Sequence, residues 1–168
     1  MNSIDLHEVF YESEPGILRW KTDRMAGRWM KVKLASAGDI AGCKLKGDGR
    51  WQITYAGHSW LRSRWIWIMH NGPIQAGMEI DHKDGDCTRD SIDNLRLANR
   101  SQNKANIGKK KNNTSGYKGV SKFRGGWRAR IMVNGKEKHL GAYPTPEAAY
   151  NHYCKAAKEL YGEFSNFG

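Results

Sequence analysis

Cysteine is scarce in this chain. Its three cysteines, Cys43, Cys87 and Cys154, stand far apart, and no two of them form a C-x-x-C pair. An odd number of isolated cysteines argues against a disulfide framework and against a zinc finger. We therefore expect an intracellular protein that is not secreted.

Long apolar runs are also missing. Met1–Phe10 lacks the basic stretch and the apolar run of a signal peptide. The most apolar segment, Trp60–Met69, is interrupted by Arg62 and Arg64 and is too short to span a bilayer. The sequence therefore predicts no membrane partner.

Acidic residues are few. The 17 Asp and Glu residues are outnumbered by 28 Lys and Arg residues, which leaves a formal charge of +11. Between Lys104 and Leu140 the single acid is Glu137. A solvated basic surface would explain the charge alone. Such clustering instead favours nucleic acid as the partner, because basic side chains near phosphates release condensed counterions.

The 168 residues suffice for two or three small domains. We divide them into a β-rich N-terminal region (1–72), a motif region (73–107), a basic polar linker (108–116) and a C-terminal module (117–168).

Local patterns predict several elements. In the first region we expect strands at Ile17–Trp20 and Trp51–Tyr55, a hairpin turn at Gly47–Gly49, a helix within Trp60–His70, and tryptophans in the core. In the last region three strands and one helix are expected: Tyr117–Phe123, Trp127–Val133, Lys138–Tyr143, and a helix capped by Thr145 and ended by Gly162.

The motif region carries the candidate chemistry. Asp81 and His82 follow an apolar stretch, Asn94 lies 12 residues after His82, and Asn103 lies nine residues after Asn94. A strand, a loop, a second strand and a helix could gather these side chains around one metal ion. Asp84, Asp86 and Asp90 do not fit the EF-hand calcium pattern, so we interpret them as turn residues.

The stretch from Glu79 to about Asn106 resembles the His-Asn-His (HNH) nuclease motif of phage and intron homing endonucleases, in the variant that ends in asparagine. Phe10–Gly72 is similar, less specifically, to the N-terminal region of such phage enzymes. Members often place a histidine before an arginine ahead of the motif, where this chain has Ser63 and Arg64. The resemblance implies a ββα-metal finger that cuts DNA. The protein would be a nicking or homing enzyme. If the gene is phage-borne, the enzyme would act in the cytoplasm of a bacterial host.

The resemblance also implies roles. Asp81 and Asn103 would hold one Mg²⁺ or Mn²⁺ ion through oxygen atoms, which suit hard cations. His82 would be the general base, because a neutral imidazole can accept a proton near pH 7. Asn94 would orient the loop or the histidine ring, and Arg96 would contact a phosphate or make a structural ion pair.

The C-terminal module resembles the AP2 DNA-binding domain, which is a three-stranded antiparallel sheet packed on one helix. The similarity lies in four segments: Tyr117–Val120, Trp127–Ile131, His139–Tyr143 and Pro146–Tyr150. Ser121 and His139 depart from the plant members, so the base preference of those members is not transferred.

Side-chain alternation predicts two faces for Trp127–Val133. Trp127, Ala129, Ile131 and Val133 would face the helix, whereas Arg128, Arg130 and Met132 would face away and could reach a DNA groove. A solvated sheet face is the alternative. The candidate DNA-contacting residues are Arg96, Lys118, Lys122, Arg124, Arg128, Arg130 and Lys138.

The sequence thus predicts an α+β protein with a β-rich N-terminal region, a metal finger and an AP2-like module. Its predicted function is metal-dependent, site-specific hydrolysis of double-stranded DNA, with no obligate protein partner evident. Two alternatives stay open: a non-catalytic DNA-binding regulator, and an RNA-binding protein, which would rather show stacking aromatics than a metal finger.

Overall fold

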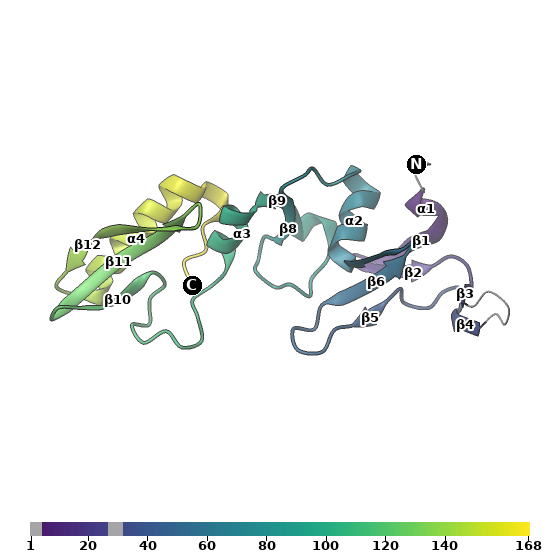
Figure 1. Cartoon of the computed structure of the whole chain (residues 1–168), viewed down its shortest axis with the longest axis horizontal. Helices are drawn as coiled ribbons and strands as arrows, with labels where there is room; N and C mark the ends of the chain where they lie inside the picture. The colour runs from purple at the N-terminus through teal and green to yellow at the C-terminus, as the bar shows by residue number, and fades with distance from the viewer. Residues whose placement is uncertain (1–4, 27–31) are drawn as a thin grey trace. The chain divides into compact units, whose positions relative to one another are not determined.

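A computed structural model describes residues 5–26 and 32–168. It combines helices with several small sheets, as expected for an α+β protein (Figure 1). The chain forms two compact units. The N-terminal unit comprises Met1–Ala76 and Asp86–Arg96, and the C-terminal unit comprises Gly77–Gly85 and Leu97–Gly168. No helix in the described ranges is long and apolar enough to cross a membrane.

In its described residues, the N-terminal unit contains three small antiparallel sheets, β1–β2, β3–β4 and β5–β6–β7. Its elements are α1 (Leu6–Val9), β1 (Phe10–Glu14), β2 (Ile17–Trp20), β3 (Arg24–Ala26), β4 (Val32–Ala35), β5 (Cys43–Lys44), β6 (Trp51–Tyr55), β7 (His58–Leu61), α2 (Arg62–Asn71) and the short 3-10 helix η1 (Ile92–Asn94). The predicted strands at 17–20 and 51–55 and the predicted helix are confirmed. So is the turn at 47–49, which joins β5 to β6.

Aromatic side chains build the core of the N-terminal unit. The ring of Phe10 lies 4.8 Å from that of Trp20 and 6.0 Å from that of Trp65, measured between centroids. The indole nitrogen of Trp65 donates to the carbonyl of Ile53 at 3.2 Å, so its polar atom is satisfied inside the core. Trp20 and Trp65 therefore pack in the core, as expected.

A buried ion pair joins α2 to the 86–96 segment. The Nε of Arg62 donates to Asp90 Oδ2 at 2.8 Å, and the guanidinium lies 5.2 Å from the ring centroid of Trp51. The interpretation of Asp90 as a turn residue is therefore wrong, because its carboxylate is buried against Arg62. Asp86 does hold a turn, since its Oδ1 accepts from the backbone nitrogen and the hydroxyl of Thr88.

The C-terminal unit contains a two-stranded sheet, β8–β9, and the antiparallel sheet β10–β11–β12. Strand β9 runs across the division between the units. The elements are β8 (Met78–His82), β9 (Leu95–Asn99), α3 (Arg100–Asn106), β10 (Val120–Phe123), β11 (Gly126–Val133), β12 (Lys136–Tyr143), α4 (Pro146–Tyr161) and η2 (Gly162–Phe164).

Helix α4 covers one face of the three-stranded sheet (Figure 1). Ala129 and Ile131 of β11 are buried against Ala149 and Tyr153 of α4, which confirms the predicted apolar strand face. A Cβ at Gly119 would lie 2.2 Å from the Tyr153 ring, so only glycine allows this approach. The predicted cap is also present: the backbone nitrogen of Ala148 donates to the Thr145 hydroxyl at 3.2 Å.

Helix α3 packs on this module inside the C-terminal unit. The Ser101 hydroxyl lies 3.0 Å from that of Tyr161, and the backbone nitrogen of Asn134 donates to Ser101 Oγ at 3.2 Å. The 108–116 segment carries its own polar contacts, including a 2.8 Å bond from Asn113 Nδ2 to the Tyr117 carbonyl. The division of the chain at this segment stays a prediction.

Candidate functional site

Strand β8 and helix α3 bring the central motif residues together. Side chains alternate along a strand, so Glu79 and Asp81 share one face of β8. Helix α3 begins with a capping box: Asn99 Oδ1 accepts from the backbone nitrogens of Ser101 and Gln102, and Gln102 Oε1 accepts from that of Asn99 at 2.8 Å. This start sets the rotation of the helix and hence the direction of its later side chains.

Two asparagines of α3 contact the two acids of β8. The Nδ2 of Asn103 donates to Glu79 Oε2 at 2.5 Å. The Nδ2 of Asn106 lies 3.1 Å from each carboxylate oxygen of Asp81 and donates to the His82 carbonyl at 2.6 Å. Asp81 is 4% exposed and Asn106 is 5% exposed. We call these five residues the β8–α3 site.

His82 is the last residue of β8, and two hydrogen bonds to its carbonyl hold its backbone in place. Its carbonyl accepts from Asn106 Nδ2 and from the backbone nitrogen of Gly85, at 2.9 Å for the latter. Gly85 has a φ of +78°, a conformation that glycine adopts without strain. The predicted turn after His82 is therefore present and begins at the candidate base.

Asn94 and Arg96 occupy buried positions in the N-terminal unit. The Nδ2 of Asn94 donates to the Arg89 carbonyl at 2.9 Å, which braces the loop that precedes β9. The burial of Arg96 differs from the exposure expected of a phosphate contact. The expected roles of both residues stay predictions.

A cation at the β8–α3 site would rest on oxygen donors. In the ranges 5–26 and 32–168, no three His, Cys, Asp or Glu side chains gather closely enough to hold a metal ion. Asp81 supplies a carboxylate and Asn103 an amide oxygen, and Mg²⁺ commonly combines one or two carboxylates with retained waters. The donor chemistry of this site therefore fits a hard divalent cation.

The expected basic face is present on the three-stranded sheet. The register pairs Ser121 with Arg128 and Arg130 with His139, and these side chains lie on the face away from α4. Arg128 Nε donates to Ser121 Oγ at 3.1 Å, and Arg130 Nη1 bonds Glu137 Oε2 at 2.7 Å. The guanidinium groups of Arg124 and Arg128 lie 5.2 and 5.4 Å from the Phe123 ring centroid.

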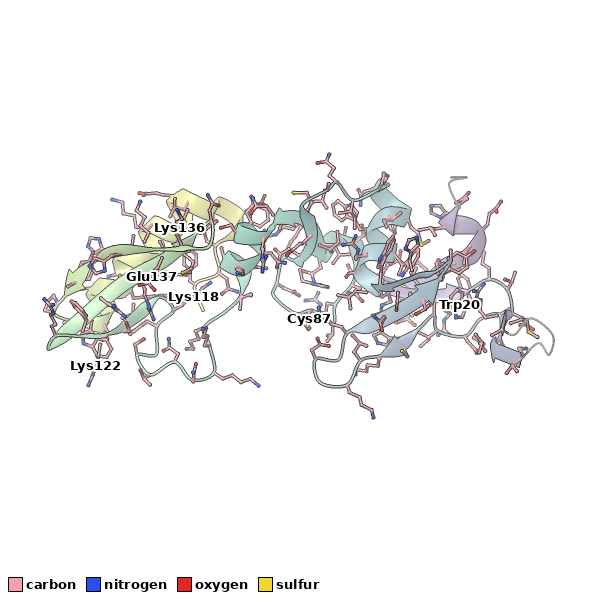
Figure 2. The ribbon with its side chains drawn as sticks, in the orientation of Figure 1. Trp20, Cys87, Lys118, Lys122, Lys136 and Glu137 are labelled. Atoms are coloured by element: carbon pink, nitrogen blue, oxygen red, sulfur yellow. The ribbon has the colours of Figure 1, made fainter. Side chains whose placement is uncertain are left out.

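Three of the candidate DNA-contacting lysines do not lie on the sheet face that carries Arg128. Lys122, labelled in Figure 2, pairs with Trp127, and Lys138 pairs with Ile131. The register therefore puts both lysines on the opposite side of the sheet from Arg128. The Nζ of Lys118 donates to the carbonyls of Ala105 and Asn166, at 2.6 and 2.8 Å. Burial lowers the pKa of Lys118 to about 8. Lys118 therefore ties α3 to the C-terminal tail.

Sequence reasoning did not single out Glu79 and Asn106 as site residues. A signal for each existed locally. Glu79 stands two residues before Asp81, which gives the same strand face, and Asn106 stands three residues after Asn103, which gives the same helix face.

Comparisons with known proteins bear on the same stretch. A family model described as HNH endonuclease matches residues 61–105. Protein 3.8 of Escherichia phage T7 is 39% identical over 104 residues, which make up 61% of this chain and 85% of the phage protein. A protein of Acanthamoeba polyphaga mimivirus that is named an HNH endonuclease is 33% identical over 99 residues, 58% of this chain and 51% of that protein. No solved structure gives a significant match.

Proposed function

Because the chain belongs to the HNH endonuclease family, we propose that it hydrolyses phosphodiester bonds of double-stranded DNA at the β8–α3 site. The observation that carries this proposal is the buried contact between Asp81 and Asn106, which fixes an acid beside His82 on the end of β8. Burying a carboxyl group costs free energy unless it is hydrogen-bonded, and Asn106 supplies such a hydrogen bond to Asp81.

Each residue of the site has a proposed task. Asp81 and Asn103 would hold a divalent cation, for which we propose Mg²⁺, through their side-chain oxygens. When bound, such an ion stabilises the charge that develops on the phosphate and on the leaving 3′ oxygen. His82 takes a proton from the water whose oxygen attacks phosphorus as the P–O3′ bond breaks. Asn94 keeps its proposed role of orienting the loop before β9.

DNA binding is assigned to the three-stranded sheet and α4, acting as an AP2-like module. Arg128 and Arg130 stand on the sheet face that α4 leaves uncovered, and Arg124 stands at the end of the same hairpin. Arginine on an exposed strand can reach base edges in the major groove, as in other sheet readers. Sequence preference would then come from this face and cleavage from the β8–α3 site.

A plasmid assay with His82→Ala tests the proposed function. Loss of the general base should lower cleavage by about 10²-fold or more, and DNA binding in a gel-shift titration should stay near that of the unaltered protein. Supercoiled plasmid distinguishes nicking from linearisation in the same experiment. Cleavage by the unaltered protein and the variant at equal rates would sink the assignment of His82. Binding without cleavage by the unaltered protein would favour a DNA-binding regulator.

A further inference from the structure

The contact between Glu79 and Asn103 determines which end of the amide faces the acid. An ionised carboxylate can only accept hydrogen bonds, and an asparagine amide donates only through its nitrogen. The 2.5 Å contact therefore requires Asn103 Nδ2 at Glu79 Oε2, which turns Asn103 Oδ1 away from Glu79. A hard cation binds the oxygen and not the nitrogen. Glu79 thus selects the amide orientation that a metal ligand needs.

Asn106 orients the side chain of Asp81 in a similar way. Its nitrogen lies at the same distance, 3.1 Å, from both carboxylate oxygens, so it contacts the two oxygens equally. The same nitrogen holds the His82 carbonyl at 2.6 Å. One buried amide therefore sets both the side chain of the proposed ligand and the backbone of the proposed base.

We propose that Glu79 and Asn106 are positioning residues, which aim the oxygens of Asn103 and Asp81 at one cation. This inference rests on the proposed function. The two contacts lie next to each other between β8 and α3. Glu79 and Asp81 are two residues apart on the strand, and Asn103 and Asn106 are three residues apart on the helix. These are the spacings at which side chains are neighbours on one face. Partners of metal ligands typically contribute about 10–100-fold to metal affinity.

Glu79 could instead serve as a ligand through its own charge, and substitutions distinguish the two roles. Glu79→Gln keeps an oxygen that accepts from Asn103 but removes the charge. Glu79→Leu removes both. A positioning role predicts that the Glu79→Gln variant stays much closer to the unaltered protein than the Glu79→Leu variant, which should bind the cation about 10–100-fold more weakly.

A reversed pair gives a sharper test. Asn103→Asp alone sets two carboxylates against each other, so it should lower the thermal unfolding midpoint measured without Mg²⁺. The double variant Glu79→Gln with Asn103→Asp restores a donated hydrogen bond, from the introduced glutamine amide on β8 to the introduced carboxylate on α3, at unchanged net charge. Recovery of the unfolding midpoint in the double variant is the coupling that a direct contact predicts, since the effects of contacting residues are not additive.

The experiment is a calorimetric titration of the full chain with Mg²⁺, in the absence of DNA. The variants are Glu79→Gln, Glu79→Leu, Asn106→Ala, Asn103→Asp and the reversed pair. The control is Glu159→Gln, which removes one carboxylate on the exposed side of α4. The thermal unfolding midpoint of each variant is recorded without Mg²⁺ as well. We expect weak Mg²⁺ binding by Glu79→Leu and Asn106→Ala. We expect the reversed pair to unfold at a higher temperature than Asn103→Asp.

The outcomes separate the two proposals. Three outcomes would overturn the positioning role while leaving the nuclease proposal standing. They are an equal loss of Mg²⁺ affinity in Glu79→Gln and Glu79→Leu, no loss in either, or an unfolding midpoint of the reversed pair no higher than that of Asn103→Asp. Failure of the unaltered protein to bind Mg²⁺ at all would overturn both. If Glu79→Leu does not fold, the isosteric Glu79→Gln variant and the reversed pair still decide.

Discussion

The two units use arginine in different ways. In the N-terminal unit Arg62 and Asp90 form an ion pair whose side chains are 6% and 4% exposed. Arg24 lies 4.7 Å from the ring centroid of Trp20 and 4.8 Å from that of Tyr55. In the C-terminal unit the paired side chains of Arg130 and Glu137 are 40% and 45% exposed.

This contrast shows that a basic residue is not by itself a DNA contact. The formal charge of +11 is a property of the whole chain. Arg62 is occupied by a buried partner and an aromatic ring, whereas Arg128 and Arg130 stay accessible on an open sheet face. We therefore expect substitutions of the first kind to change stability and those of the second kind to change DNA affinity.

The largest effect is expected at the buried ion pair. Arg62→Ala removes one partner of a buried ion pair, which should lower the free energy of unfolding by about 3–5 kcal/mol. Arg130→Ala breaks an exposed pair and should cost about 0–1 kcal/mol. Urea unfolding of both variants measures the difference. An equal decrease in the free energy of unfolding of the two variants would contradict the difference between the buried and the exposed arginine.

A smaller effect, on DNA, is expected at the sheet. Arg128→Ala should weaken binding to the target site by about 1–3 kcal/mol and relax preference at one base position. Lys110→Ala, in the loop before β10, should weaken binding to all sequences alike and lower the salt slope by about 0.9. Titrations on target and scrambled duplexes at several salt concentrations measure both. If only the lysine variant lost its preference for the target duplex over the scrambled duplex, the sheet face of Arg128 would not be the one that recognises the DNA sequence.

The smallest effect concerns Lys118. Because burial lowers its pKa to about 8 in the folded protein, the unfolded chain, with a lysine pKa of about 10.4, binds more protons between these values. Stability from this residue therefore rises as pH increases from about 8 to about 10. Lys118→Met should remove that rise, although the lost bonds to Ala105 and Asn166 lower stability at every pH.

Urea unfolding of the unaltered protein and of Lys118→Met at both pH values checks this prediction. The difference in unfolding free energy between them should widen at the higher pH. A difference that stays constant would show that Lys118 titrates as an exposed lysine does.

The local elements of the fold were predictable because their signals are local. Thr145 and Gly162 mark the ends of α4, and the alternation along β11 separates Arg128 from Ala129. The contacts across elements were not predictable in this way. The bond between Asn106 and Asp81 joins residues 25 apart and depends on how α3 lies on β8. Asp90 was misassigned for the same reason, since its partner Arg62 lies 28 residues earlier.

Two candidate DNA-contacting lysines lie off the face of Arg128 and Arg130, for a reason of register. Lys122 and Lys138 lie among basic residues in the sequence, but pairing with Trp127 and Ile131 puts them on the other side of the sheet. The register between β11 and β12 shifts between Ala129 and Arg130, which opposes Arg130 to His139. Such bulges reorient side chains and have no clear sequence signature here.

The most direct test of the nuclease proposal is the dependence of cleavage on a divalent cation and on Asp81. Supercoiled plasmid is incubated with the full chain in Mg²⁺, in excess chelator, and with Asp81→Ala in Mg²⁺. We predict nicked or linear product in the first reaction only, because chelation removes the cation and the substitution removes its carboxylate ligand. Undiminished cleavage in chelator, or by Asp81→Ala in Mg²⁺, would contradict the proposed mechanism.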